Sequence, residues 1–147
     1  MPTHLTPDAA AILHAILGMG LLTLVMLGWM VLTRLPAMQR LGLPPQAGAH
    51  TKDMAAKLPS SVRRISDNYN HLFEAPTAFY ATALAIVALG QADPLHAKCA
   101  WAYLGLRVLH SLVQATVNIV MVRFTLFGLS MAVLGTMIVR ASIASFL

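Results

Sequence analysis

Four long apolar stretches, separated by shorter polar segments, dominate the pattern of this chain. A helix needs about 20 predominantly apolar residues to cross the hydrocarbon core of a bilayer. The pattern therefore predicts an all-α protein with four membrane-spanning helices, over residues 9–33, 60–90, 94–122 and 124–145. The first half of the second helix, RRISDNYNHLFE, is polar, so we expect it to project towards the cytoplasm or to lie inside the protein.

The connection between the first two helices is expected to be the one long loop. Pro36 disfavours helical geometry at Leu35, so we expect the first helix to stop near Arg34. The segment that follows is rich in Gly and Pro and carries mixed charge, which is typical of a loop. It leaves room for a short helix over residues 53–58.

Capping residues and prolines mark other boundaries. Thr6 precedes Pro7 at the expected start of the first helix, and Asp93 precedes Pro94 at the start of the third. Pro is tolerated in the first turn of a helix, and Asp93 is the expected N-cap of the third helix. Pro76 lies inside the second helix, where it removes one backbone hydrogen bond and predicts a kink.

The composition agrees with a membrane protein. The chain is 58% hydrophobic and only 10% charged, with a mean hydropathy of +0.71, whereas soluble domains are about 45–50% apolar and about 25% charged. We therefore interpret residues 1–147 as one integral membrane domain. The lone Cys99 excludes an internal disulfide, and neither its surroundings nor those of His110 predict a metal site.

The net charge of +5 is concentrated in one segment rather than spread over a surface. Six of the ten Lys and Arg residues lie between positions 34 and 64: Arg34, Arg40, Lys52, Lys57, Arg63 and Arg64. This is typical of a cytoplasmic loop and not of a nucleic-acid interface. With Arg123 the loops on this side hold seven cations, against Lys98 and Arg140 on the other. We therefore expect both termini to be periplasmic if the protein resides in a bacterial inner membrane.

Polar residues inside the third helix indicate a site. Arg107, His110, Gln114 and Asn118 follow spacings of 3, 4 and 4, which place them on one helix face. Ionisable groups at membrane depth usually face a bundle interior or a wet cavity. Glu74 is the expected partner of Arg107, because both lie about a third of the way into their apolar stretches.

Two interpretations of these polar residues remain open. Stripes at spacings of 3 and 4 also run along the polar half of the second helix: Arg63, Asp67, Asn70 and Glu74 on one, and Arg64, Asn68 and His71 beside it. The residues could form an ion-pair network that holds two helices in register. Alternatively, they could line a wet cavity, open to the cytoplasm, for an anionic, amide-rich small molecule.

Two motifs resemble the MAPEG family, the membrane-associated proteins of eicosanoid and glutathione metabolism. The first is the segment from Arg64 to Pro76, which contains DNYNHLFEAP. The second and more specific motif is GLRVLHSLVQ, followed by Arg123 sixteen residues after Arg107. The resemblance covers the four-helix plan and implies a homotrimer with glutathione, the co-substrate, in a cytoplasm-facing pocket between neighbouring subunits.

The resemblance also implies roles for individual residues. Arg123 would lie near the thiol and act in catalysis, while the remaining site residues would bind glutathione: Arg34, Arg64, Asn70, His71, Glu74, Arg107, His110 and Gln114. Two positions depart from the family pattern. Asn70 and Glu74 are one residue further apart than usual, so Asn68 or His71 is an alternative to Asn70, and Gln114 replaces a common Tyr.

The resemblance implies a glutathione-dependent transferase or peroxidase. An arginine beside the thiol favours the thiolate, which would attack a small apolar electrophile or a lipid hydroperoxide entering from the bilayer. The alternative is a non-enzymatic lipid-binding or scaffold protein on the same fold with a degenerate glutathione pocket. A transporter or channel is disfavoured, because the sequence shows no inverted repeat.

Overall fold

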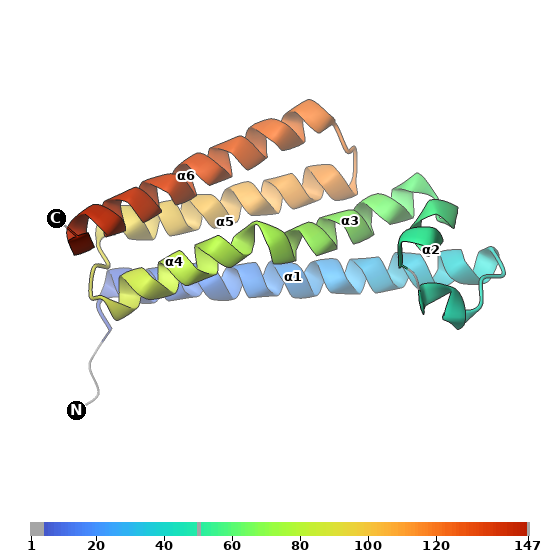
Figure 1. Cartoon of the computed structure of the whole chain (residues 1–147), viewed down its shortest axis with the longest axis horizontal. Coiled ribbons are helices and arrows are strands. Elements are labelled where there is room, and N and C mark those ends of the chain that lie inside the picture. Colours follow the sequence, from blue (N-terminus) through green and yellow to red (C-terminus); the bar gives the residue numbers. More distant parts are fainter. Residues whose placement is uncertain (1–4, 50, 147) are drawn as a thin grey trace.

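The computed structural model describes residues 5–49 and 51–146, and its regular structure over these residues is entirely helical (Figure 1). The helices are α1 (Pro7–Arg40), a short 3-10 helix η1 (Pro45–Ala49), α2 (Thr51–Lys57), α3 (Ser60–Glu74), α4 (Pro76–Ala88), α5 (Pro94–Ala115) and α6 (Val120–Phe146).

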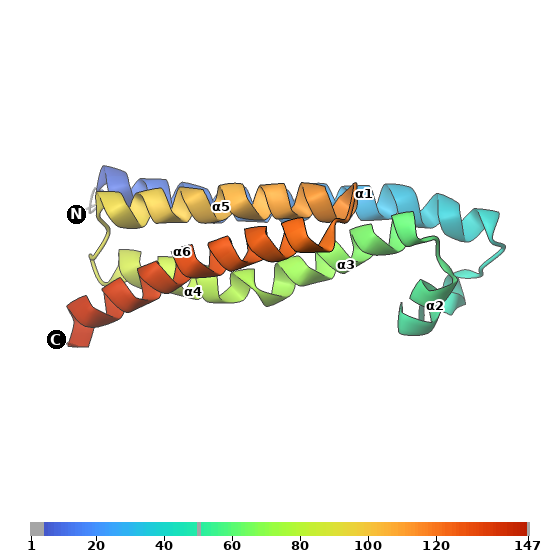
Figure 2. The ribbon, with the colours of Figure 1, turned by 90° about the horizontal axis from the view of Figure 1, so that it is seen from above.

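The long helices run along one axis as an elongated bundle (Figures 1 and 2). The start of α1, the turn between α4 and α5 and the end of α6 lie at one end. The segment from η1 to α3 and the turn between α5 and α6 lie towards the other. The connections that carry most of the positive charge are therefore directed towards the same end of the bundle.

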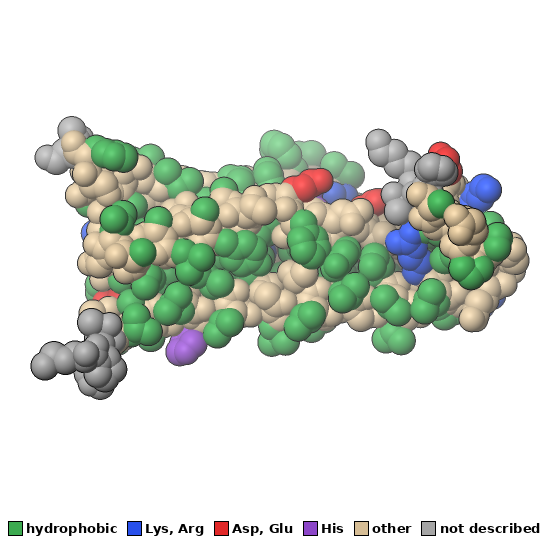
Figure 3. Space-filling view, turned by 60° about the horizontal axis from the view of Figure 1, so that its bottom comes forward, with side chains coloured by type: hydrophobic (Ala, Val, Ile, Leu, Met, Phe, Trp, Pro, Cys, Tyr) green, Lys and Arg blue, Asp and Glu red, His purple; other side chains and the backbone are tan. Residues whose placement is uncertain are grey.

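Three helical stretches are long and apolar enough to cross a membrane: Pro7–Arg40, Ser60–Ala88 and Val120–Phe146. The remaining predicted span, the third, corresponds to α5, which has 22 residues but is more polar. This helix packs against α1, α3 and α6, so its polar side chains face protein. Large apolar side chains cover the outer surface of the bundle (Figure 3). Apolar surface of this extent marks a contact with membrane or protein, and three helices are long and apolar enough to cross a bilayer, so the chain is an integral membrane protein.

The expected end of the first helix is wrong, because α1 continues through Pro36 to Arg40. Proline removes the hydrogen bond to the carbonyl of Leu32, four residues earlier, and its ring crowds that carbonyl, which costs a helix about 3 kcal/mol or more. Packing of α1 against α3 supports the continued helix. Arg34 thus lies within α1, with Nη2 3.7 Å from Sδ of Met54 in α2.

The predicted cap at Asp93 and the predicted start of the first helix at Thr6 and Pro7 are confirmed, and an interruption lies next to Pro76, where the sequence predicts a kink. Thr6 Oγ1 accepts a hydrogen bond from the backbone N–H of Ala9, and Asp93 Oδ1 accepts one from that of His96. Helical hydrogen bonding is interrupted between α3 and α4, directly before Pro76. The hydroxyl of Thr77 donates to the Glu74 carbonyl at 2.6 Å and so provides a partner at the break.

The expected third helix is too long. Helix α5 ends at Ala115, and Asn118 adopts a left-handed conformation with φ of 56° in the turn before α6. Asn tolerates this conformation better than most residues, and it commonly ends helices. Asn118 therefore does not share the face of Arg107, and Arg123 lies in the first turn of α6 rather than after the end of the preceding helix.

Apolar side chains from α1, α4, α5 and α6 form the core at the end of the bundle that holds the termini. Phe79 of α4 stacks on Tyr103 of α5 with ring centroids 4.3 Å apart. Helices α1 and α5 approach closely at Gly18, where an added Cβ would lie 2.6 Å from Cδ2 of Leu104. This tight half of the bundle holds α5 in place, so that its polar residues meet α3 and α6 in the other half.

Candidate functional site

Arg107 is the centre of the polar cluster and is fully buried. Its Nη2 atom lies 3.2 Å from Nδ1 of His71 and 3.4 Å from the His71 carbonyl oxygen, so it connects α5 to α3. The expected pair between Arg107 and Glu74 is not formed, since Glu74 is exposed and makes no ion pair among the described residues. Three residues after His71, Glu74 is rotated about 60° around α3, away from α5.

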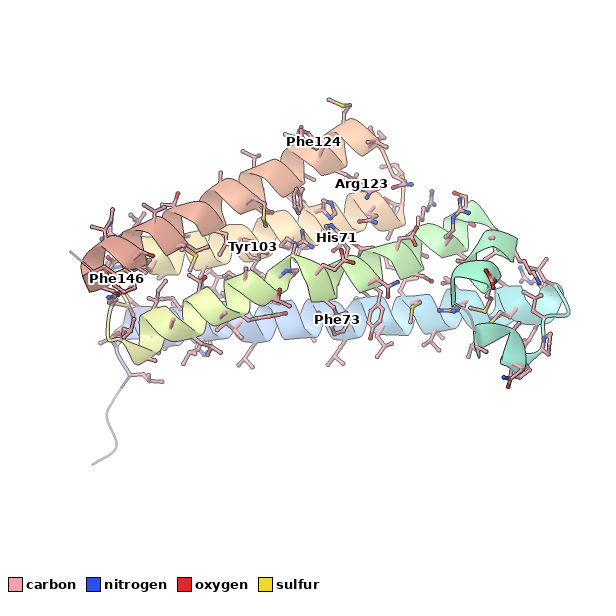
Figure 4. The ribbon with its side chains drawn as sticks, in the orientation of Figure 1. His71, Phe73, Tyr103, Arg123, Phe124 and Phe146 are labelled. Carbon is pink, nitrogen blue, oxygen red and sulfur yellow. The ribbon has the colours of Figure 1, made fainter. Side chains whose placement is uncertain are left out.

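Aromatic rings surround the two histidines. The rings of His71 and His110 stack with centroids 5.4 Å apart and an interplanar angle of 20°. Phe127 of α6 is tilted against both rings, at 5.6 Å from His71 and 6.5 Å from His110. This contact brings α3, α5 and α6 together, and Figure 4 shows His71 between α3 and α5, with Arg123 at the beginning of α6.

A pocket of about 200 Å³ opens beside this stack. We call it the aromatic pocket, and its lining residues are His71, His110, Val120, Arg123, Phe124 and Phe127. Nη1 of Arg123 donates to Oδ1 of Asn118 at 2.7 Å, which orients the guanidinium. The pocket thus combines a cation and imidazole groups with an apolar wall, which suits a ligand with an anionic part and an apolar part.

The polar interior behind the aromatic pocket is incompletely hydrogen-bonded within the described chain. Both side-chain amide atoms of Asn68 are buried without a partner, as are Nε and Nη1 of Arg107, Nδ1 of His110, Oγ of Ser111 and Oε1 of Gln114. Native proteins satisfy roughly 90% or more of their buried polar groups. A concentration of such atoms around one cation therefore marks a place where polar ligands or water can bind.

A second cavity, of about 350 Å³, lies between α1, α2 and α3, and we call it the interfacial pocket. Its lining residues are Arg34, Ala55, Leu58, Arg63, Ser66, Asp67 and Asn70. Arg34 lies 27 residues after Pro7, or about 40 Å along a straight helix, so it reaches the headgroup region when the start of α1 lies in the opposite interface. Ala88 ends α4 at the end of the bundle where α1 begins, and His71 is only about 26 Å from it along a straight helix. The aromatic pocket therefore lies closer to that end than the interfacial pocket does.

The structure therefore divides the predicted site residues. It brings His71, Arg107, His110 and Arg123 together and places Gln114 among the buried polar groups nearby, whereas Arg34 and Asn70 line the interfacial pocket. Arg64 is half-buried, with Nε buried and unpartnered, and Glu74 is exposed; neither lines a pocket described above.

The sequence interpretation missed Phe124, Phe127 and the part played by Asn118. Arg123 and Phe127 are spaced i, i+4, a pattern that places both on one face of a helix. That signal could be used only after the start of α6 at Val120 was known, because Arg123 was assigned to a turn.

Opposite charges are absent from the centre of the site. The ion pairs of the described residues are those that Asp93 makes with Arg140 and with His96, at the other end of the bundle. There the backbone N–H of His96 and the Arg140 guanidinium hold the pKa of the Asp93 carboxyl below its usual range. Within residues 5–49 and 51–146, no carboxylate lies within ion-pair distance of Arg107 or Arg123, so the site favours an anion.

Comparison with protein families gives one match, and it covers most of the chain. The model of the MAPEG family matches residues 12–143. Comparisons with curated proteins and with solved structures gave no match. The match spans α3, α5 and α6, which carry the buried arginine and the aromatic pocket. The chain is thus a member of the MAPEG family of membrane proteins.

Proposed function

We propose that this protein is a membrane-bound, glutathione-dependent transferase or peroxidase that acts on apolar electrophiles or lipid hydroperoxides. The observation that carries the proposal is the burial of Arg107 next to the aromatic pocket, with two of its N–H groups unpartnered and no carboxylate to neutralise it. An anion with several hydrogen-bond acceptors, such as glutathione, supplies what this cluster lacks.

The binding roles follow from the positions of the charges. Arg107, His110 and Gln114 bind a carboxylate or the peptide backbone of glutathione from the interior. Arg34, Arg64 and Asn70 bind the part of the tripeptide that extends towards the headgroup region. Glu74 is available for the glutathione ammonium group, while His71 holds the Arg107 guanidinium from α3.

Arg123 is the proposed catalytic group. A thiol with a pKa of about 8.5 is only a few per cent thiolate at pH 7. An arginine beside the sulfur favours the charged form, and each unit by which it lowers the thiol pKa corresponds to about 1.4 kcal/mol. Asn118 holds the Arg123 guanidinium, and Phe124 and Phe127 provide the apolar wall along which a substrate dissolved in the bilayer enters.

We further propose a homotrimer in a bacterial inner membrane, with the basic end of the bundle in the cytoplasm. The resemblance to the family supports the trimer, and the seven-to-two distribution of cations supports the orientation. Native mass spectrometry in mild detergent should show mainly trimer. A C-terminal fusion to a reporter that works only in the cytoplasm should give no signal.

The decisive test is titration of glutathione into the purified protein, followed by ultraviolet absorbance of the thiolate and by thermal unfolding. Ligand at 100 times its dissociation constant should stabilise the protein by about 2.7 kcal/mol. Arg123→Ala should lose most of the thiolate signal but keep most of the thermal shift. Arg140→Ala, which alters an exposed arginine at the other end of the bundle, is the matched control and should resemble the parent. A parent with neither signal contradicts the proposal.

A non-enzymatic lipid-binding protein is the second candidate. The observation in its favour is the apolar wall of the aromatic pocket, formed by Val120, Phe124 and Phe127. Such a protein would be stabilised by a fatty acid or a phospholipid, whereas millimolar glutathione would produce neither a thermal shift nor a thiolate. The same titration therefore separates the two functions.

A further inference from the structure

The contact with Arg107 fixes which nitrogen of His71 carries the proton. A guanidinium has five N–H donors, no acceptor, and remains protonated in proteins. Since Nη2 of Arg107 lies 3.2 Å from Nδ1 of His71, Nδ1 must be the unprotonated, accepting nitrogen. The imidazole is then neutral with its hydrogen on Nε2, because the partner of one ring nitrogen determines the state of the other.

The Nε2–H group of His71 is available to a ligand. It makes no hydrogen bond among the described residues, and it is not one of the fully buried, unpartnered atoms. The His71 ring lines the aromatic pocket, where stacking on His110 and contact with Phe127 limit its rotation. The pocket therefore holds one oriented, neutral N–H donor in addition to the cation of Arg123.

We propose that His71 is a substrate-binding residue that selects apolar α,β-unsaturated carbonyl compounds, by donating its Nε2–H to the carbonyl oxygen. This inference rests on the proposed glutathione-dependent function and names the class of its second substrate. A neutral imidazole can polarise a carbonyl in this way without transferring its proton. Arg107 acts on the reaction through His71, as a positioning residue.

The reaction is a conjugate addition. The thiolate sulfur forms a bond to the β-carbon, the electron pair of the C=C bond moves to form the enolate, and negative charge develops on the carbonyl oxygen. The His71 Nε2–H stabilises this oxygen, as donors placed where charge develops do in other enzymes. Water then delivers a proton to the α-carbon. The product is the thioether, nothing leaves, and the proton lost by the thiol is balanced by the one gained at carbon.

The test compares two substrates in the same protein. A straight-chain trans-alkenal has a carbonyl oxygen, whereas an alkyl iodide of the same chain length reacts with the same thiolate and has no oxygen acceptor. The kcat/KM values are measured in the presence of saturating glutathione, with the uncatalysed rates subtracted. Their ratio cancels changes in folding, in glutathione binding and in thiolate formation, because both substrates share these.

His71→Phe keeps a ring in the stack and removes the N–H. We expect the alkenal-to-iodide ratio to fall by about 100-fold, the lower end of the effect of deleting one such donor. His71→Gln, whose amide supplies an N–H, should restore part of the ratio and serves if the Phe variant does not fold. His14→Phe, which alters an exposed histidine on α1, is the control and should leave the ratio unchanged.

Other outcomes overturn the inference in distinguishable ways. If His71→Phe lowers both rates equally, or neither, His71 does not select for the carbonyl group. A parent that gives a glutathione thiolate and reacts with the iodide but not with the alkenal contradicts this inference alone. A parent that forms no thiolate and reacts with neither substrate contradicts the proposed function together with it.

Discussion

Replacing Arg107 with Met should stabilise the ligand-free protein, although it removes the central residue of the site. Arg107 is fully buried, and two of its nitrogen atoms have no partner among the described residues. Each unmade hydrogen bond of a buried group costs about 1–3 kcal/mol, so the two together cost about 4 kcal/mol.

The hydrogen bond from Arg107 to Nδ1 of His71 offsets part of this cost, and the second contact of Nη2, 3.4 Å from the His71 carbonyl oxygen, is longer and weaker. A hydrogen bond that involves a charged group contributes about 1.5–3 kcal/mol, so its loss in Arg107→Met removes about 2 kcal/mol. The net effect is a stabilisation of about 2 kcal/mol, within the range found when buried charges are replaced by packed apolar side chains. For a chain of this length it corresponds to a rise in Tm of about 4–8 °C.

The assay is thermal unfolding in detergent, with and without glutathione, for the parent and two variants. Arg107→Met should unfold at a higher temperature than the parent and should lose the shift caused by glutathione. Arg140→Met, which alters an exposed arginine paired with Asp93, should keep that shift and gain no stability. A lower Tm for Arg107→Met would show that Arg107 is well satisfied in the folded protein and that the reasoning is wrong.

Three further predictions concern the ends of helices. Asp93→Ala should lower the free energy of unfolding by about 0.5–2 kcal/mol, because it removes the cap of α5. The pKa of Asp93 is lowered in the folded state, so this contribution is present above about pH 4 and is lost on further acidification. The Tm of the parent should therefore fall more steeply with acid than that of Asp93→Asn. Glu74→Ala should change the free energy of unfolding by no more than an exposed substitution does, about 0.5 kcal/mol, because Glu74 makes no ion pair in the described chain. Asn118→Gly should keep the left-handed turn but remove the acceptor of Arg123, so thiolate absorbance should decrease with little change in Tm. Asn118→Val should in addition lower the free energy of unfolding by about 1–2 kcal/mol, because its side chain disfavours φ of 56°.

Each of these has a result that would contradict it. Equal acid sensitivity of the parent and Asp93→Asn would show that the capping carboxylate does not contribute through its charge. A large loss of stability in Glu74→Ala would indicate a partner from another subunit. Unchanged thiolate absorbance in Asn118→Gly would show that Arg123 does not depend on Asn118 or is not the activating group.

Local features were predicted well from the sequence because their causes are local. The start of α1 at Thr6 and Pro7, the cap at Asp93 and the interruption before Pro76 depend on residues within a few positions of the helix ends. The apolar stretches reflect the bilayer, which every span must meet. Pro36 is the exception, since packing of α1 against α3 outweighs the local preference of one residue.

Only the tertiary structure decided which polar residues meet. Helical spacing placed Arg107 and His110 on one face of α5 and correctly indicated that this face is buried, but it did not specify how α3 is rotated about its axis. That rotation directs His71 towards Arg107 and leaves Glu74 exposed. It is set by the packing of many apolar side chains along both helices, whereas spacing within one helix fixes only which residues share a face.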